Sequence, residues 1–209
     1  MNNPPTTNQN DSVTRRDFLR TSATAAAAAT LSGLDLTRSA HAAGSGVIKI
    51  GLIGCGGRGT GAAINAMNAG PDVRLVAVAD IFDERLHNGL AQVKKAKPEQ
   101  VEVKDDHCFV GFDAYEKLIA SGVDVVLIAP ASHFIPQMLK AAIDAGKHVF
   151  CEKPHGLDVP AVTICEAASE AAKKKSLSLV SGLCWRYDTG VRETIERIHG
   201  GAIGEILAI

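Results

Sequence analysis

The sequence predicts an α/β fold with a doubly wound parallel sheet, and three observations carry that prediction. From residue 47 onward, short apolar segments rich in β-branched residues alternate with segments of helical periodicity. The strand-like segments are apolar throughout, which is typical of parallel strands that helices cover on both faces. The composition is that of a folded domain, because 46% of the 209 residues are hydrophobic and 22% are charged.

Residues 1–42 precede this pattern and have a different character. A polar segment, 1–14, leads to Arg15 and Arg16, and a mildly apolar, Ala-rich run follows and ends in small residues up to Ala42. This order is typical of a twin-arginine signal peptide, the alternative being an N-terminal helix of the mature fold. We therefore expect residues 1–42 to engage the twin-arginine export machinery and the protein to be periplasmic or otherwise exported.

The first half of the predicted sheet starts with residues 47–53, a β-branched run that ends in glycines. The helical pattern of 62–69 follows, and residues 73–79 form a second apolar run closed by an acidic residue. Residues 83–95 have helical periodicity, and a proline shortly afterwards ends that helix. Residues 99–111 predict a loop with one short strand.

The second half repeats the alternation. Residues 112–120 predict a helix ended by a Ser-Gly pair, and residues 123–129 form a third clear strand. A helix over 134–145 and a short strand over 148–151 come next. The helix predicted over 159–174 ends beside three lysines, which suit the negative end of a helix dipole.

A glycine-rich loop follows the first predicted strand and matches the pattern G-x-G-x-x-G. Its six residues are Gly54, Cys55, Gly56, Gly57, Arg58 and Gly59. Gly54 permits a tight turn, Gly56 lets a pyrophosphate approach the backbone, and Gly59 lets the next helix pack closely. Free N–H groups at the helix start then face the phosphates. Strand, loop and helix occur in the required order, so we expect a Rossmann-like cofactor site; a ligand-free turn is the alternative.

Asp80 lies at the end of the second strand, 21 residues after Gly59. A carboxylate there accepts hydrogen bonds from ribose hydroxyls and repels a 2′-phosphate. Arg85 is the nearby cation that could reach such a phosphate. NAD is therefore the expected cofactor, and NADP stays open.

The last segments run past the sheet. Residues 177–181 predict its final strand, 190–198 a helix, and 204–209 the start of another strand. We expect a Rossmann NAD(P)-binding domain over 43–182. Over 183–209 we expect a linker helix and the first strand of a truncated C-terminal α/β domain. A single apolar strand without neighbours would expose its edge and its apolar face and so promote association, which favours truncation.

A second signature closes the strand over 148–151, at the edge where open α/β sheets bind ligands. Together with the earlier motifs it resembles the Gfo/Idh/MocA family, whose members include glucose–fructose oxidoreductase and inositol dehydrogenases. The resemblance covers essentially all of the chain after the signal peptide. The matching segments are 54–59, Asp80, 145–149, Glu152-Lys153-Pro154, 182–188 and 201–206.

The resemblance implies an NAD(P)-dependent oxidoreductase that transfers a hydride between a nicotinamide cofactor and a CH–OH group of a sugar or polyol. It makes Lys153 the catalytic residue near the substrate hydroxyl, beside the cofactor. The resemblance also implies that Glu152 borders the nicotinamide and that Arg186 lies near the cofactor. The alternatives are a solvated surface lysine for Lys153 and a surface ion pair for Arg186. The family's catalytic histidine belongs to the second domain, beyond Ile209, and the full-length protein is expected to be a homo-oligomer.

Two regions depart from the family's pattern. Ser132 and Ile135 stand where relatives often have Asn and His near the nicotinamide, and His133 is out of that register. Cys184 stands where many relatives have Asn.

Composition excludes several other functions. A balance of 22 Lys+Arg against 23 Asp+Glu argues against nucleic acid as a partner. The sequence has no run of about 18 strongly apolar residues, so we expect no stable membrane span. The five cysteines lack metal-ligand spacing, so no metal is expected, and buried reduced thiols are favoured over disulfides. The alternative functions are an NAD-using glycosidase or lyase of the same fold, and a non-catalytic nucleotide-binding fragment.

Overall fold

The computed structural model describes residues 46–208. The predicted signal peptide over 1–42 and the last residue of the predicted strand over 204–209 lie outside these residues. Among the residues described, no helix combines the length and the apolar character needed to cross a membrane.

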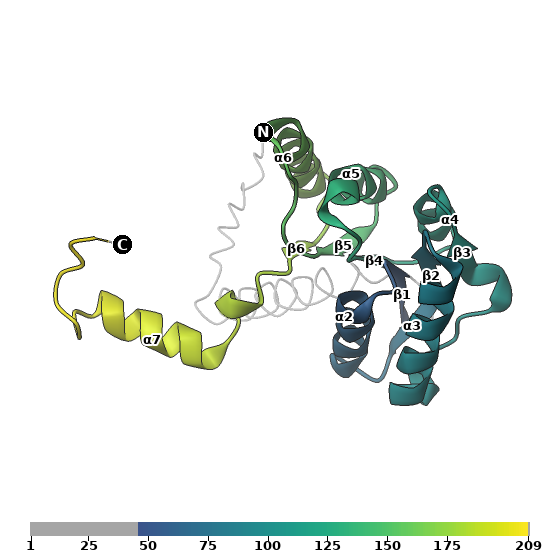
Figure 1. The fold of residues 1–209 in the computed structure, drawn as a ribbon, viewed down its shortest axis with the longest axis horizontal. Helices are drawn as coiled ribbons and strands as arrows, with labels where there is room; N and C mark the ends of the chain where they lie inside the picture. Colours follow the sequence, from purple (N-terminus) through teal and green to yellow (C-terminus); the bar gives the residue numbers. More distant parts are fainter. Residues whose placement is uncertain (1–45, 209) are drawn as a thin grey trace, which may run out of the picture. The chain divides into compact units, whose positions relative to one another are not determined.

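The centre of the fold is a parallel six-stranded sheet with the strand order β3-β2-β1-β4-β5-β6 (Figure 1). Every pair of neighbouring strands is parallel. The chain builds outward from the middle strand in one direction and then in the other, which confirms the doubly wound fold. The strands are β1 Ile48–Ile53, β2 Val73–Asp80, β3 Cys108–Val110, β4 Val125–Ile128, β5 His148–Cys151 and β6 Leu179–Ser181.

Helices connect the strands, and within residues 46–208 four short 3-10 turns lie in the connections between them. The helices are α2 Gly57–Asn68, α3 Asp83–Ala96, α4 Ala114–Ala120, α5 Ile135–Asp144, α6 Val159–Lys174 and α7 Thr189–His199. The 3-10 turns are η1 Pro98–Gln100, η2 Asp105–His107, η3 Ser132–Phe134 and η4 Cys184–Arg186.

Two buried apolar clusters lie on the two faces of the sheet. On one face α2 and α3 contribute residues such as Met67 and Leu90. On the other face α4, α5 and α6 contribute residues such as Leu118 and Leu139. Gly51 of β1 allows α4 to sit close, because a Cβ there would lie 2.7 Å from Leu118 Cδ2. Burial on both faces explains why the strands are apolar throughout.

The two halves of the sheet are not covered equally. On the face that α2 packs against, a groove of about 500 Å³ is left open, and its walls include Val125, Leu127 and Phe150 of β4 and β5. Helix α7 has no buried residues, and the Asp188 side chain caps it by accepting a hydrogen bond from Val191 N at 2.8 Å.

Several predicted boundaries shift by one or two residues, among them those of β1, β4 and α5. Helix α2 begins at Gly57 rather than at residue 62, because the end of the glycine loop already forms the first helical turn. Helix α4 begins at Ala114, two residues after the predicted start. Residues 204–208 form no strand and are exposed, because no strand within 46–208 pairs with them.

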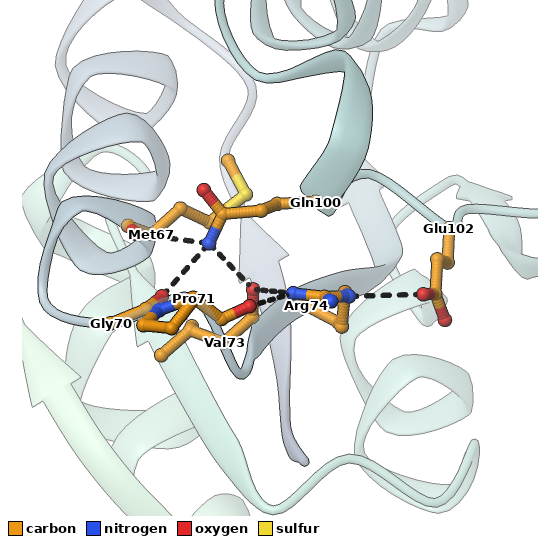
Figure 2. A network of polar contacts seen from close by, with 7 residues as sticks. All are labelled: Met67, Gly70, Pro71, Val73, Arg74, Gln100 and Glu102. Atoms are coloured by element: carbon orange, nitrogen blue, oxygen red, sulfur yellow. Dashed lines mark hydrogen bonds and ion pairs between the residues drawn. The ribbon is translucent and has the colours of Figure 1, made fainter.

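A polar network holds the turn between α2 and β2 at the amino edge of the sheet (Figure 2). Gln100 Nε2 donates to the carbonyl oxygens of Met67, Gly70 and Val73 at 3.0, 2.9 and 3.0 Å. Beside it, Arg74 Nε lies 3.1 Å from a Glu102 carboxylate oxygen. The network gives a donor to one carbonyl at the end of α2, one in the turn and one at the start of β2.

Candidate functional site

The glycine loop lies between β1 and α2, and its first and last glycines are enclosed by backbone. Gly54 has a positive φ of 89°, and a Cβ there would lie 2.6 Å from the carbonyl oxygen of Ala129. A Cβ at Gly59 would lie 1.8 Å from the carbonyl oxygen of Gly54. Side chains at these positions would therefore separate the helix from the strand.

The middle of the loop is open. Gly56 is the residue before α2 and is extended, and a Cβ there would meet nothing closer than Arg85 Cδ at 4.0 Å. Gly57 has open space at its Cβ position. The first N–H groups of α2 have no helical acceptors, so a cradle of donors faces a surface without side chains. This arrangement fits a pyrophosphate.

Asp80 closes β2 and holds the loop. Its Oδ2 accepts a hydrogen bond from Cys55 N at 2.7 Å, and its Oδ1 accepts one from Phe82 N at 3.0 Å. The residue is 8% exposed. Each carboxylate oxygen has a second lone pair, so Asp80 can also accept hydrogen bonds from ribose hydroxyls.

Two adjoining hollows lie at the glycine loop, and Asp80 lines the smaller one. The smaller, about 170 Å³, has mainly apolar walls, and the larger is an open groove of about 1050 Å³ along the glycine loop and α3. Gly56, Ile81, Phe82 and Arg85 line both. The smaller hollow combines apolar walls, the Asp80 carboxylate and the glycine loop, which are the features that a dinucleotide requires, so the residues present fit NAD.

The Cys55 side chain is part of the core rather than the site. It is 2% exposed, and its sulfur lies 3.6 Å from the carbonyl oxygen of Ala79. Burial, reinforced by the negative charge of Asp80, raises the pKa of the Cys55 thiol to about 12. Its backbone N–H, by contrast, is the group that Asp80 binds.

Glu152 and Lys153 follow β5 directly, at the same edge of the sheet. Glu152 is 4% exposed and forms an ion pair with Arg58. Lys153 is exposed, and its side chain has no hydrogen bond or ion pair with the residues that the structure describes. The peptide bond between Lys153 and Pro154 is cis. The structure thus brings together the glycine loop, Asp80 and Glu152, with Lys153 free at their margin.

Other predicted positions lie apart from this group. Arg186 is exposed on η4, and within residues 46–208 its side chain has no ion pair or hydrogen bond. Ile135 is 1% exposed and belongs to the core, so it does not face the site as a histidine would. Ser132 is half-buried, and Cys184 is exposed.

The cysteines are all free, but they are not all buried. Cys55 and Cys151 are buried, Cys108 and Cys165 partly so, and Cys184 is exposed. The expectation of buried thiols is wrong for Cys184, because η4 lies outside the sheet. No group of three or more His, Cys, Asp or Glu side chains in the described part of the chain could hold a metal ion.

Sequence patterns missed two aromatic residues at this edge, Phe82 and Tyr115. Phe82 and Tyr115 line the smaller hollow, and the Arg85 guanidinium lies 5.3 Å from the centre of the Phe82 ring. Gly182 packs against the Glu152 carboxylate. The signal available for Phe82 was its position just after β2, because residues that follow a strand lie at the ligand edge.

Sheet order, glycine loop and acidic residue together define a dinucleotide-binding Rossmann domain. A family model described as "Oxidoreductase family, NAD-binding Rossmann fold" (Gfo/Idh/MocA) matches residues 48–183. The chain belongs to this oxidoreductase family, and the cofactor that its site fits is NAD.

Similar proteins include several inositol dehydrogenases. Myo-inositol 2-dehydrogenase of Thermotoga maritima is 30% identical over 160 residues, which is 76% of this chain and 42% of that protein. A glycosyl hydrolase family 109 protein of Streptomyces niveus is 31% identical over 77% of this chain and 31% of its own length. A crystal structure of scyllo-inositol dehydrogenase from Lactobacillus casei with bound NAD(H) and scyllo-inositol is 29% identical with a TM-score of 0.60, covering 77% of this chain and 43% of that one. The chain thus spans less than half the length of these relatives.

Proposed function

We propose that the protein is an exported NAD-dependent oxidoreductase that transfers a hydride between the nicotinamide and a CH–OH group of a polyol or sugar. The observation that carries the proposal is the meeting of two motifs at one edge of the sheet. The glycine loop with Asp80 forms the dinucleotide cradle. Glu152, the residue before Lys153, forms an ion pair with Arg58 of that loop. Inositol dehydrogenases among the relatives support a polyol substrate.

Each group has a distinct task in this proposal. Backbone N–H groups of the loop bind the pyrophosphate, and Asp80 binds a ribose. Bound NAD supplies the hydride acceptor. Lys153, exposed and unpaired among the described residues, hydrogen-bonds the substrate hydroxyl and relays its proton to water as the C–H hydride leaves.

The test is NAD reduction at 340 nm with a panel of inositols, other polyols and aldoses. Lys153→Ala should lower kcat by about 100-fold or more, the range for loss of a general acid–base group, while NADH still binds. Lys173→Ala, an exposed lysine near the end of α6, is the matched control and should leave kcat unchanged. Unchanged turnover in Lys153→Ala would remove this lysine from the reaction.

A second candidate is an NAD-using glycosidase that oxidises its substrate only transiently. Family 109 glycosyl hydrolases match this chain at an identity similar to that of the inositol dehydrogenases. Release of a sugar from a nitrophenyl glycoside, without net change in NADH absorbance, would favour this activity. Cofactor binding with neither reaction would favour a non-catalytic nucleotide-binding fragment.

Export by the twin-arginine route is part of the proposal and rests on residues 14–20 and the small residues before position 43. Replacing Arg15 and Arg16 with lysine should keep the protein in the cytoplasm, whereas the unmodified protein should reach the periplasm. Equal fractionation of both would contradict this route.

Two further parts of the proposal concern assembly. Residues 43–182 form the nucleotide-binding domain, and residues 183–209 begin a second α/β domain. We propose a homo-oligomer, supported by apolar side chains left exposed on β6 and α6, such as Val180 and Val162 at 42% and 46%. Light scattering on the purified protein tests it, and a monomer at micromolar concentration would contradict it.

A further inference from the structure

Arg58 belongs to the glycine loop, but its side chain leaves the cofactor hollows. Its guanidinium pairs with Glu152 and so joins the start of α2 to the end of β5, across 94 residues of sequence. Arg58 lines the groove on the α2 face, together with Gly182 and Tyr187. It lines neither of the two hollows at the glycine loop.

The two partners are buried to different extents. The Glu152 side chain is 5% exposed, and that of Arg58 is 50% exposed. A nearly buried carboxylate needs a charged or hydrogen-bonding partner to offset its lost hydration. Within residues 46–208, Arg58 is the one polar partner of the Glu152 carboxylate. Glu152 therefore depends on this contact more than Arg58 does.

Gly182 also lies against this carboxylate. A Cβ at position 182 would lie 2.6 Å from Glu152 Oε1 and 2.9 Å from Oε2. Gly182 N donates to the carbonyl oxygen of Cys151 at 2.8 Å, which fixes the end of β6 beside β5. The carboxylate is thus held between the start of α2 and the end of β6.

The backbone transmits the restraint on Glu152 to Lys153, the catalytic residue of the proposed function. Glu152 N donates to the carbonyl oxygen of Ile128 at 2.8 Å, so the residue is fixed both by backbone and by side chain. Lys153 is the next residue, exposed and without such restraints of its own. Movement of Glu152 would therefore displace the starting point of the Lys153 side chain.

We propose that Arg58 is a positioning residue for the nicotinamide half of the site, acting through Glu152, and that it is not a ligand of the pyrophosphate. The open N–H cradle at Gly56 and Gly57 binds the pyrophosphate without it. The inference rests on the proposed function in taking NAD as the cofactor and in placing its nicotinamide beside Glu152 and Lys153.

ADP-ribose and NADH are the two probes that separate these roles. Both contain the pyrophosphate, and only NADH carries the nicotinamide ring. Dissociation constants for both, and the fluorescence of bound NADH, are measured for the unmodified protein and for Arg58→Gln, Arg58→Lys, Glu152→Gln and the double variant Arg58→Gln/Glu152→Gln. Arg192→Gln, on exposed α7, is the surface control, and melting temperatures confirm that each variant is folded.

Arg58→Gln should raise the Kd of NADH about tenfold and weaken the fluorescence enhancement, a loss within the range for contacting residues. The Kd of ADP-ribose should change less than about twofold. Arg58→Lys should recover part of the loss, because it keeps the charge without the planar fork. The double variant should be no weaker than the weaker single variant, since both act through one contact.

Equal weakening of ADP-ribose and NADH in Arg58→Gln would overturn the proposal and make Arg58 a phosphate ligand. Additive losses in the double variant would also overturn it, because the two residues would then act separately. A protein that meets all the binding expectations but oxidises no polyol or sugar would refute the proposed function alone.

Discussion

Asp80 Oδ2 accepts a hydrogen bond of 2.7 Å from the backbone N–H of Cys55, so the carboxylate that ends β2 also fixes the glycine loop. Its other oxygen holds Phe82 N at 3.0 Å. The acidic residue expected to bind ribose is thus a structural element of the cradle before any cofactor arrives.

Replacing Asp80 with alanine should therefore reduce stability and cofactor affinity together. Two N–H groups lose their acceptor, at a cost of about 1–3 kcal/mol each if they stay buried and unpaired. Urea unfolding measures the loss of stability, and titration calorimetry with NADH measures affinity. Asp105→Ala on η2 is the control, and a full loss of affinity without loss of stability would contradict the dual role of Asp80.

Gly59→Ala should be far more damaging than Gly61→Ala, although both lie in α2. The new methyl at position 59 would sit 1.8 Å from the Gly54 carbonyl oxygen, whereas at position 61 the nearest atom is Arg58 Nη1 at 4.0 Å. Overpacking at Gly59 should cost about 3 kcal/mol. Alanine at Gly61 should stabilise the helix by about 0.5–1 kcal/mol. Paired denaturation curves give both values, and equal effects would show that α2 does not need its close approach to β1.

Thiol reagents should modify Cys184 first and leave Cys55 and Cys151 unmodified in the folded protein. Burial raises the pKa of both buried thiols to about 12, and for Cys151 the nearby Cys165 and Glu152 raise the pKa further. Because the thiolate is the reactive form, these two residues stay protonated and inert at pH 8. Counting sites with Ellman's reagent, with and without denaturant, tests this. Cys184→Ser should remove the fast phase.

The same raised pKa values predict weaker folding in alkali. The unfolded thiols ionise near pH 9, whereas the folded Cys55 thiol ionises only near pH 12. The folded state therefore binds more protons between these values, and the free energy of unfolding falls as the pH rises through this window. Cys55→Ala should flatten that decline in denaturation measured from pH 8 to 10.5. If the free energy of unfolding fell equally steeply in Cys55→Ala, other titrating groups would be its cause.

Gln100→Leu should destabilise the fold without changing the cofactor site. Three carbonyl oxygens lose their shared donor, with an expected cost of about 1–3 kcal/mol. NADH affinity should be unchanged, because the network lies at the amino edge of the sheet. Glu99→Ala, a neighbour in η1, is the control for the segment. Weakened NADH binding in a folded Gln100→Leu protein would show that the two edges are coupled.

The sequence was sufficient to predict the sheet because its signals are local. Apolar runs such as 125–128 fall between helical segments, and Gly54 and Gly59 follow the first strand at fixed spacing. Each of these signals depends on a few consecutive residues. The doubly wound arrangement then follows from the alternation of strands and helices, together with the pattern of the glycine loop, whereas the order of the strands comes from the structure.

Contacts between distant segments could not be predicted in the same way. The partner of Arg58 is 94 residues away, and whether its side chain turns toward a phosphate or toward Glu152 depends on how β5 and β6 end. Residues 204–208 have the composition of a strand, but a strand also needs a neighbour to pair with. Ile135 was compared with a site histidine by position, and only the packing of α5 shows that it is buried.

The Gln100 network has a consequence for how this domain can evolve. It stabilises one edge of the sheet (Figure 2), while the glycine loop and Asp80, which form the cofactor cradle, lie at the other. Substitutions that alter specificity often cost stability. Such losses can be offset by improvements around η1 and the α2–β2 turn, so the domain can acquire new ligand preferences while remaining folded.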